Sequence, residues 1–320
     1  MMRIVRRALP SLMLVALLTA PAFGQASLTD AIVSAVRAAQ AQHVKENLAD
    51  DDLAVTVIDL RDATNPVTGS FRGDQPMFPA SVVKLFYLAY AQRLIEDGKL
   101  AESEELRRGL RDMIVDSSND ATSFVLDTIT DAPNGGLLPP AEMEQWALKR
   151  NAVNRFFADE GYAKINVNQK AYCEGPYGRE RIFIGPKLEN RNKLTTDATA
   201  KLLAEIAQRR FGSPARSDAM LALLARDRTK KTTGPDDQAH GFIAGALPPS
   251  VKAWSKAGWT STARHDAAYL ESEDGTVRAV IVIFTTSHGR SRQIIPALGE
   301  KLYRSLSNGQ PAASTQPVAK

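Results

Sequence analysis

The order of the predicted elements indicates an α/β fold of the α+β kind, with a helical middle between parts of one sheet. Residues 28–49 have the apolar spacing of a helix, and the β-branched run 53–60 is typical of a strand. The middle of the chain predicts helices at 85–97, 102–115, 119–130, 142–157, 196–210 and 217–226. Strands at 251–259, 266–271 and 277–285 and a closing helix at 291–306 follow. We therefore expect a sheet whose edges come from both ends of the chain.

The two ends of the chain predict segments outside this domain. Three arginines precede the short apolar run 12–18, and Ala20 and Ala22 supply small residues for cleavage, so residues 1–24 are predicted to be a secretory signal peptide. The apolar run is too short to span a bilayer, which favours a periplasmic or secreted protein without stable membrane insertion. Residues 308–320 are rich in Pro, Ala, Gln and Ser and are predicted to be disordered. The folded domain is expected at 25–307.

Composition excludes several classes of function. The net charge of +4 falls to about +1 when the three arginines of the first 24 residues are removed, so nothing indicates a nucleic-acid partner. Cys173 is the only cysteine, which rules out an internal disulfide. The four histidines have no metal-ligand spacing, and we expect no metal and no other cofactor. We expect a monomer.

Ser81 and Lys84 form the only Ser-x-x-Lys pair in the chain, directly before an apolar helical run. Pro79 favours a helix start at this point, so Lys84 is expected one turn after Ser81 on the same face. A serine hydroxyl needs a neighbouring base to attack a carbonyl carbon. Lys84 can be that base if its amine is neutral, a state that burial and a second nearby cation would favour.

Two further motifs follow in order, Ser117-Ser118-Asn119 and Lys256-Ala257-Gly258. Lys256 is the candidate for the second cation, and Ser117 is expected to relay a proton to the leaving nitrogen. The oxyanion would be held by backbone N–H groups of Ser81 and of a residue on the strand after Lys256. Asn119, Lys256 and Gly258 are predicted to bind substrate.

These motifs together resemble those of class A β-lactamases and of penicillin-recognising serine hydrolases in general. Residues 113–121 are similar to the Ser-Asp-Asn segment of that family, residues 194–198 to the start of the helix after its omega loop, and residues 283–286 to its last strand. The resemblance covers most of the chain after the predicted signal peptide. It implies a mostly helical lobe beside a five-stranded antiparallel sheet, with the active site between them.

Two departures from the family pattern affect substrate choice. Ala257 stands where the family usually has Thr or Ser, whose hydroxyl helps to hold the substrate carboxylate. Thr260, Ser261 or Arg278 could supply a donor instead. The segment between Lys84 and Ser117 is also shorter than is usual, which removes a loop that normally walls the cleft.

A third departure concerns turnover of the acyl-enzyme. Class A enzymes use an omega-loop glutamate, in a Glu-x-x-Leu-Asn setting, to activate the hydrolytic water, and that pattern is missing here. Glu160, Glu174 and Glu180 lie in the corresponding window, and Glu174 and Glu180 are the better candidates by their distance before Thr195. Without a working base the acyl-enzyme would persist.

The sequence therefore predicts an exported serine hydrolase of the class A β-lactamase type that opens β-lactam amides through a Ser81 acyl-enzyme. Its substrate would be a small β-lactam or a cell-wall peptide. The alternatives are a D,D-peptidase or esterase on the same fold, and a penicillin-binding module that is acylated without turnover.

Overall fold

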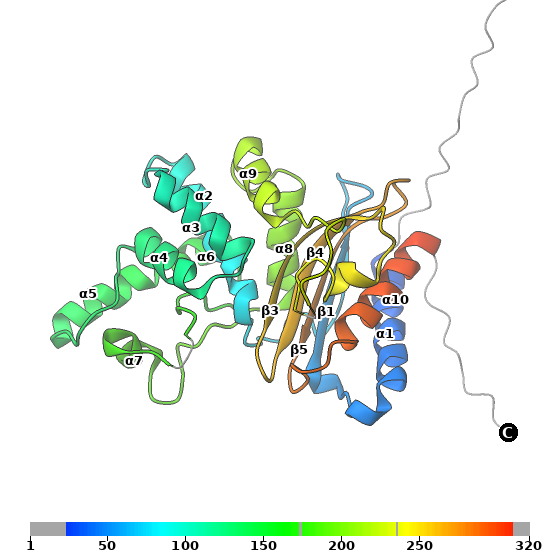
Figure 1. Ribbon diagram of the computed structural model, residues 1–320, viewed down its shortest axis with the longest axis horizontal. Coiled ribbons are helices and arrows are strands. Elements are labelled where there is room, and N and C mark those ends of the chain that lie inside the picture. Colours follow the sequence, from blue (N-terminus) through cyan, green and yellow to red (C-terminus); the bar gives the residue numbers. More distant parts are fainter. Residues whose placement is uncertain (1–23, 173–174, 235, 310–320) are drawn as a thin grey trace, which may run out of the picture.

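Five strands form one antiparallel sheet in the order β2-β1-β5-β4-β3. The computed structural model describes residues 24–172, 175–234 and 236–309. The strands are β1 (Leu53–Asp59), β2 (Val67–Phe71), β3 (Lys252–Trp259), β4 (Arg264–Glu271) and β5 (Arg278–Thr285). The central pair joins β1 to β5 across more than 200 residues, with Val55 opposite Ile283. One edge of the sheet, β2, comes from the N-terminal part and the other, β3, from the C-terminal part, as predicted (Figure 1).

Two helices from the chain ends cover one face of the sheet. These are α1 (Gln25–Gln42) and α10 (Ile294–Asn308), which lie together on the right of Figure 1. Successive side chains of a strand point to opposite faces. Thus Val55 and Val57 of β1 pack with α1 and α10, whereas Ala54 and Ile58 pack on the other side. Both faces are covered, so β1 is buried throughout.

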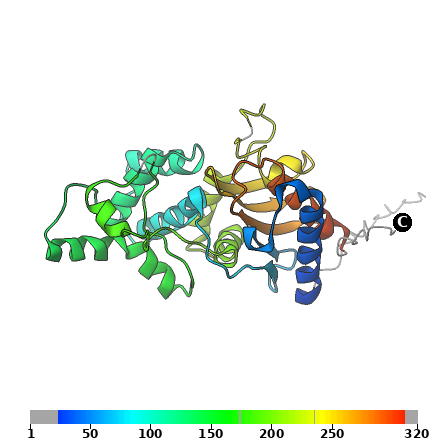
Figure 2. The same cartoon turned by 90° about the horizontal axis from the view of Figure 1, so that it is seen from below.

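The opposite face of the sheet carries α8 (Thr196–Ala207) and, beyond it, a helical lobe. Figure 2 shows this lobe and the sheet as two bodies side by side. The lobe contains α2 (Lys84–Glu96), α3 (Glu104–Ile114), α4 (Asn119–Thr130), α5 (Pro140–Arg150), α6 (Ala152–Asp159), α7 (Gly178–Ile184) and α9 (Pro214–Leu224).

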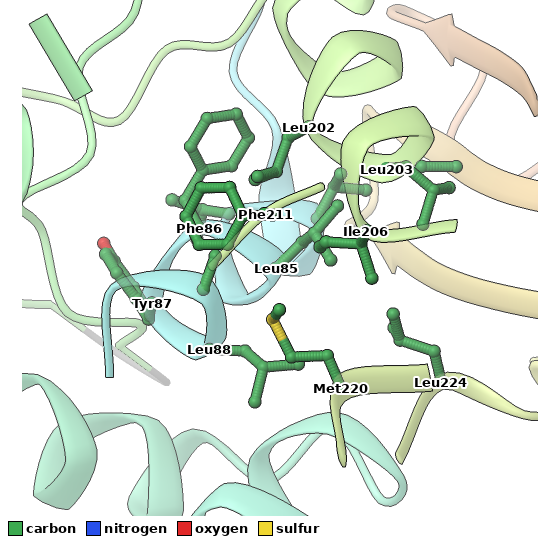
Figure 3. Close-up of a cluster of buried hydrophobic side chains, with 14 of the residues drawn as sticks. Leu85, Phe86, Tyr87, Leu88, Leu202, Leu203, Ile206, Phe211, Met220 and Leu224 are labelled. Atoms are coloured by element: carbon green, nitrogen blue, oxygen red, sulfur yellow. The ribbon is translucent and has the colours of Figure 1, made fainter. Parts of the chain in front are cut away.

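Helix α2 is the centre of the lobe. Every residue from Lys84 to Gln92 is buried, which is the pattern of a helix covered on all sides. Figure 3 shows Leu85, Phe86 and Leu88 of α2 among apolar side chains from α8 and α9 and from the turn between them. This packing fixes the start of α2, where the predicted nucleophile lies.

Several predicted elements differ from the structure. The expected helix at 142–157 is two helices, α5 and α6, joined at Asn151. The first helix ends at Gln42 instead of residue 49, and 3-10 turns η1 (Val44–Glu46) and η2 (Asp50–Asp52) follow. Strand β2 and helix α7 were not predicted, and neither was the 3-10 turn η4 (Ile243–Ala246). The predicted signal peptide and most of the predicted tail lie outside the described residues. Within the described ranges, no helix is long and apolar enough to cross a membrane.

Candidate active site

Ser81 lies in a single 3-10 turn, η3 (Ala80–Val83), which leads directly into α2. Pro79 caps this turn, and its carbonyl accepts a hydrogen bond from the N–H of Val82. Ala80 has a left-handed φ of 46°, a conformation that is strained for a residue with a Cβ. The N–H of Ser81 lies in the first turn, where helical N–H groups have no acceptor within the helix. This donor is therefore available beside the Ser81 hydroxyl.

Lys84 is fully buried at the first position of α2, one turn after Ser81. Its Nζ donates to the carbonyl of Ser117 at 2.6 Å and to Oδ1 of Asn119 at 2.9 Å, and it lies 3.3 Å from the Ser117 hydroxyl. Burial lowers the pKa of Lys84 to about 7. The carbonyl of Ser118, at 3.4 Å, is a third acceptor on this side. A neutral amine has two protons and one lone pair, so Lys84 can direct its protons to these acceptors and use the lone pair to accept a proton.

Lys256, on β3, reaches the same serine from the other side of the site. Its Nζ donates to the Ser117 hydroxyl at 3.0 Å, to Oε1 of Gln238 at 2.8 Å and to the carbonyl of Ala257 at 2.7 Å. Burial, and then the nearby Lys84 and Arg226, lower the pKa of Lys256 well below its ordinary value. Two amines thus meet at one hydroxyl, and Ser117 itself has a left-handed φ of 56°.

Gly258 allows the edge strand to approach the nucleophile turn. A Cβ at this position would lie 2.7 Å from the nitrogen of Ser81 and 2.8 Å from that of Val82, which are backbone atoms that cannot move aside. The N–H of Thr260 donates within the hairpin to Ala263, whereas the N–H of Ala257 points out of the sheet to Gln238. Because N–H directions alternate along an edge strand, the N–H of Trp259 also points outward, toward the side where Ser81 lies.

A cavity of about 410 Å³ opens above Ser81. Four of the predicted site residues line it: Ser81, Lys84, Asn119 and Thr260. Its other walls come from Phe78 and Val83, from Trp259, and from the segment 169–192. No carboxylate is among the described residues that line this cavity.

The three candidate glutamates have different positions. Glu180, in α7, does not line the cavity: its carboxylate accepts from Arg150 at 2.6 Å and from the Tyr172 hydroxyl at 2.9 Å, in the protein interior. Glu160 is exposed at the end of α6. Glu174 lies outside the described residues, between Tyr172 and Gly175, which both line the cavity.

Of the other donors considered for the substrate carboxylate, Arg278 is too distant. It lies opposite Glu271 at the far end of the β4–β5 ladder, whereas Asp266 is the residue beside Ala257. Ser261 follows Thr260 in the β3–β4 turn but does not line the cavity above Ser81. Thr260 is thus the candidate that the structure brings to the site.

Several site residues carry no sequence signal. Gln238 comes from the loop between α9 and β3 and binds both Lys256 and the carbonyl of Val115. Asp266 is buried beside Lys256 and Arg226, and burial raises its pKa to about 6. The side-chain oxygen of Asn192 accepts hydrogen bonds from the N–H groups of residues 168 and 169, and so holds the two ends of the segment 168–192 together at the cavity. None of them belongs to a motif, and their partners are distant in sequence.

Among the described residues, no three His, Cys, Asp or Glu side chains lie together in a group that could hold a metal ion. The reactive groups that converge here are a serine hydroxyl, two buried amines and backbone N–H groups. Such a set is typical of enzymes that form an acyl intermediate on serine.

Solved structures with the same fold are similar to this chain over most of its length. A β-lactamase from Sphaerobacter thermophilus DSM 20745 has a TM-score of 0.62 and 18% identity, over 87% of this chain and 97% of that chain. A β-lactamase from Chitinophaga pinensis DSM 2588 has a TM-score of 0.61 and 18% identity, over 86% and 98%. A mutant of PBP-A, solved as an acyl-enzyme complex with penicillin G, has a TM-score of 0.63 and 16% identity, over 90% and 100%. At these identities the likeness shows the fold.

The family itself is shown by sequence. The profile described as the β-lactamase enzyme family matches residues 37–306, and the chain belongs to that family. The resemblance to class A β-lactamases and the α+β fold with a five-stranded antiparallel sheet are thereby confirmed. No sequence among curated proteins matches the chain.

Proposed function

We propose that this protein is a penicillin-recognising serine hydrolase in which β-lactam amides acylate Ser81. The observation that carries the proposal is the convergence of Lys84 and Lys256 on the Ser117 hydroxyl. Lys84 lies one helical turn after Ser81, and both of these residues line the cavity. Burying an amine is costly, and neither Lys84 nor Lys256 forms an ion pair within the part of the chain that the structure describes, which favours a role in the reaction over a structural one.

In the proposed acylation step, neutral Lys84 accepts the proton of Ser81 as its oxygen attacks the β-lactam carbonyl. The N–H groups of Ser81 and Trp259 stabilise the oxyanion that forms. When the C–N bond breaks, Ser117 donates a proton to the leaving nitrogen and is reprotonated by the amines beside it. Asn119 holds Lys84 in place and lines the cavity, where it is available to the substrate amide.

The substrate carboxylate would lie at the leaving-group end, near Lys256 and Thr260. Ala257 cannot contribute a hydroxyl there, because its side chain is alanine and is buried in the core on the α1–α10 face. Thr260 lies at the cavity and supplies the hydroxyl donor in this proposal.

We propose further that the acyl-enzyme is long-lived, as in a penicillin-binding protein. Hydrolysis of the ester needs an activated water. The described cavity wall offers no carboxylate for that role, and the pKa of Lys84 is lowered by burial alone, without a carboxylate partner. Glu180 is occupied by Arg150 and Tyr172, and we assign it a structural role.

The second candidate function is efficient β-lactam hydrolysis with Glu174 as the base. The observation in its favour is that Tyr172 and Gly175, the nearest described residues before and after Glu174, line the cavity. In that case Glu174→Gln would preserve acylation and trap a penicilloyl adduct on Ser81.

Export through a signal peptide at residues 1–24 is part of either proposal and would place the enzyme where cell-wall peptides and β-lactams occur.

Two reagents test the proposal on the purified chain. A fluorescent penicillin should label the wild type stably, and mass spectrometry should find the adduct on Ser81, while a chromogenic cephalosporin is hydrolysed slowly. Ser81→Ala should abolish labelling with a nearly unchanged melting temperature. Labelling that survives in Ser81→Ala would overturn the assignment of the nucleophile. Rapid hydrolysis that Glu174→Gln abolishes would replace the long-lived acyl-enzyme by the second candidate.

A further inference from the structure

Arg191 lines the cavity above Ser81 from the segment that follows α7. Its guanidinium stacks on the ring of Phe78, with the Cζ atom 3.7 Å from the ring centroid. Phe78 lies three residues before Ser81, and its carbonyl accepts a hydrogen bond from buried His265, which fixes the stacking platform. Stacking holds the face of a guanidinium and leaves the N–H groups at its edge free to bind a ligand.

Arg191 has no acidic partner among the described residues. Burial alone lowers its pKa, whereas a neighbouring carboxylate would raise it. Other arginines at the surface of this protein, such as Arg304 with Glu300, form ion pairs. An arginine that is partly buried, stacked and without a carboxylate partner among the described residues has N–H groups that can bind an anionic ligand.

Among the charged residues that the structure describes at the cavity, Arg191 is the one without a carboxylate partner or a proposed catalytic role. The described lining residues that carry charge are Lys84, Lys170 and Arg191. Lys170 is paired with Asp127 at 2.5 Å. Lys84 has a pKa of about 7 and is the proposed base. Among the described lining residues, Arg191 is therefore the cation that has neither a carboxylate partner nor a proposed role in proton transfer.

The position of Arg191 separates it from the leaving-group end of the site. Ser117 and Lys256, which would serve the leaving nitrogen, do not line this cavity, and Thr260, proposed for the adjacent carboxylate, lines it from the end of β3, whereas Arg191 lines it from the segment after α7. Arg191 lines the cavity together with Leu188 and Asn192 of the same segment and with Phe78, on which it stacks. An acyl group bound to Ser81 would extend into this space.

We propose that Arg191 binds a carboxylate on the acyl side chain of the substrate and makes the enzyme selective for anionic acyl groups. The inference rests on the proposed acylation of Ser81 and adds a substrate class to it. A guanidinium binds a carboxylate through two parallel hydrogen bonds, so the preferred substrate would be a β-lactam or peptide whose acyl portion carries its own carboxylate.

Three penicillins with one nucleus test this selectivity. Carbenicillin has an α-carboxylate on its side chain, benzylpenicillin has no charge there, and ampicillin has an α-amino group. The second-order rate constant for acylation of Ser81 is measured for each by mass spectrometry. Arg191→Gln should lower the carbenicillin-to-benzylpenicillin ratio about tenfold, as expected for loss of a charge-assisted hydrogen-bonded pair. Arg191→Glu should reverse the preference toward ampicillin.

Two controls separate loss of selectivity from loss of folding: a variant at a surface arginine, and the acylation of Arg191→Gln by benzylpenicillin. Arg304→Gln removes a surface arginine on α10, on the other face of the sheet, and should leave all three rates unchanged. Benzylpenicillin acylation that persists in Arg191→Gln shows that the variant is folded. A carbenicillin-to-benzylpenicillin ratio that does not change in either Arg191 variant would overturn the inference alone. Failure of all three penicillins to acylate the wild type would overturn the proposed function, and this inference with it.

Discussion

At Ser117 two buried amines share one hydroxyl, and the protonation state of Lys84 decides whether the site can react. The amine must be neutral to accept the proton of Ser81, and burial places its pKa at about 7. Protonated Lys84 dominates below this pH and neutral Lys84 above it. The rate of acylation of Ser81 should therefore increase as pH rises through the physiological range.

We expect the rate constant for acylation of Ser81 by benzylpenicillin to fall about tenfold per pH unit below pH 7 and to reach a plateau above it. Stopped-flow measurement with a fluorescent penicillin, at constant ionic strength, gives the profile. Lys84→Arg, whose guanidinium stays protonated, should be inactive at every pH. A profile without this rise would show that Lys84 is not the base.

At Gly258, the addition of a single methyl group should strongly disturb the geometry of the site. A Cβ there would push against backbone nitrogens of η3 at 2.7 and 2.8 Å, so β3 or the nucleophile turn would have to move. Gly258→Ala should reduce acylation on the order of a hundredfold, since misplacing an oxyanion donor costs about that much. Gly136→Ala is the control, because nothing lies within 4 Å of its Cβ position. Equal rates in the two variants would refute the argument.

The sequence predicted the motif residues of the site and missed the residues that support them. Ser81, Lys84, Ser117 and Lys256 are recognisable because they belong to three short motifs that occur in a fixed order along the chain. Gln238, in contrast, acts through contacts to residues more than 15 positions away, and such pairings leave no local pattern. Glu180 was a candidate base by its distance from Thr195, but a linear distance cannot reveal a buried arginine as its partner.

Among the elements, the segment around α7 is held to the helical lobe by a buried ion cluster. Arg150 of α5 binds both Glu180 of α7 and Asp127 of α4, and Lys170 also pairs with Asp127. Tyr172 adds a hydrogen bond to Glu180. These contacts hold the wall of the cavity that carries Arg191, so the cluster supports the site without joining the reaction.

Glu180→Gln should lower the free energy of unfolding by about 3 kcal/mol, because it leaves a buried arginine with one partner fewer. Chemical denaturation measures this loss. The lifetime of the penicilloyl adduct should not change. Asp131→Asn, which breaks the exposed pair with Lys149, should cost less than about 1 kcal/mol. A longer adduct lifetime in Glu180→Gln would instead identify Glu180 as the deacylation base.

Long periodic elements were predicted well, and short or interrupted ones were not. Helix α4 begins and ends where its cap signal and apolar spacing place it, with Ser118 capping the N–H of Ala121. Strand β2 was missed because it is short, contains Gly69 and is an edge strand with partly exposed residues. The break at Asn151 was missed because the apolar spacing continues across it.

At the scale of the molecule, two hydrophobic cores lie on opposite faces of one sheet. The core between the sheet and the α1–α10 pair contributes stability, whereas the core around α2 also positions the nucleophile. Damage to the first core should therefore change stability without changing the chemistry of the folded enzyme.

Leu302→Ala, in the buried face of α10, should lower the free energy of unfolding by about 2–5 kcal/mol. The acylation rate of the molecules that remain folded should equal that of the wild type when both are assayed well below the melting temperature. Leu137→Ala, at a side chain that is exposed, should change neither quantity. A slower acylation in Leu302→Ala would mean that the two cores are coupled through the sheet.

The pairing of β1 with β5 has a consequence for the order of folding. In the sequence, the helical lobe lies between the first two strands of the sheet and the last three. Val55 of β1 therefore pairs with Ile283 of β5, a residue that is synthesised more than 200 positions later. Contacts over such distances form slowly, because the loop between them must first be closed. Ser81 and Lys84 can reach their helical setting early, but Lys256, Gly258 and Trp259 arrive only with the late strands. Catalytic competence is thus gained at the end of folding, and unfolded or partly synthesised chains would not yet be able to react with a β-lactam.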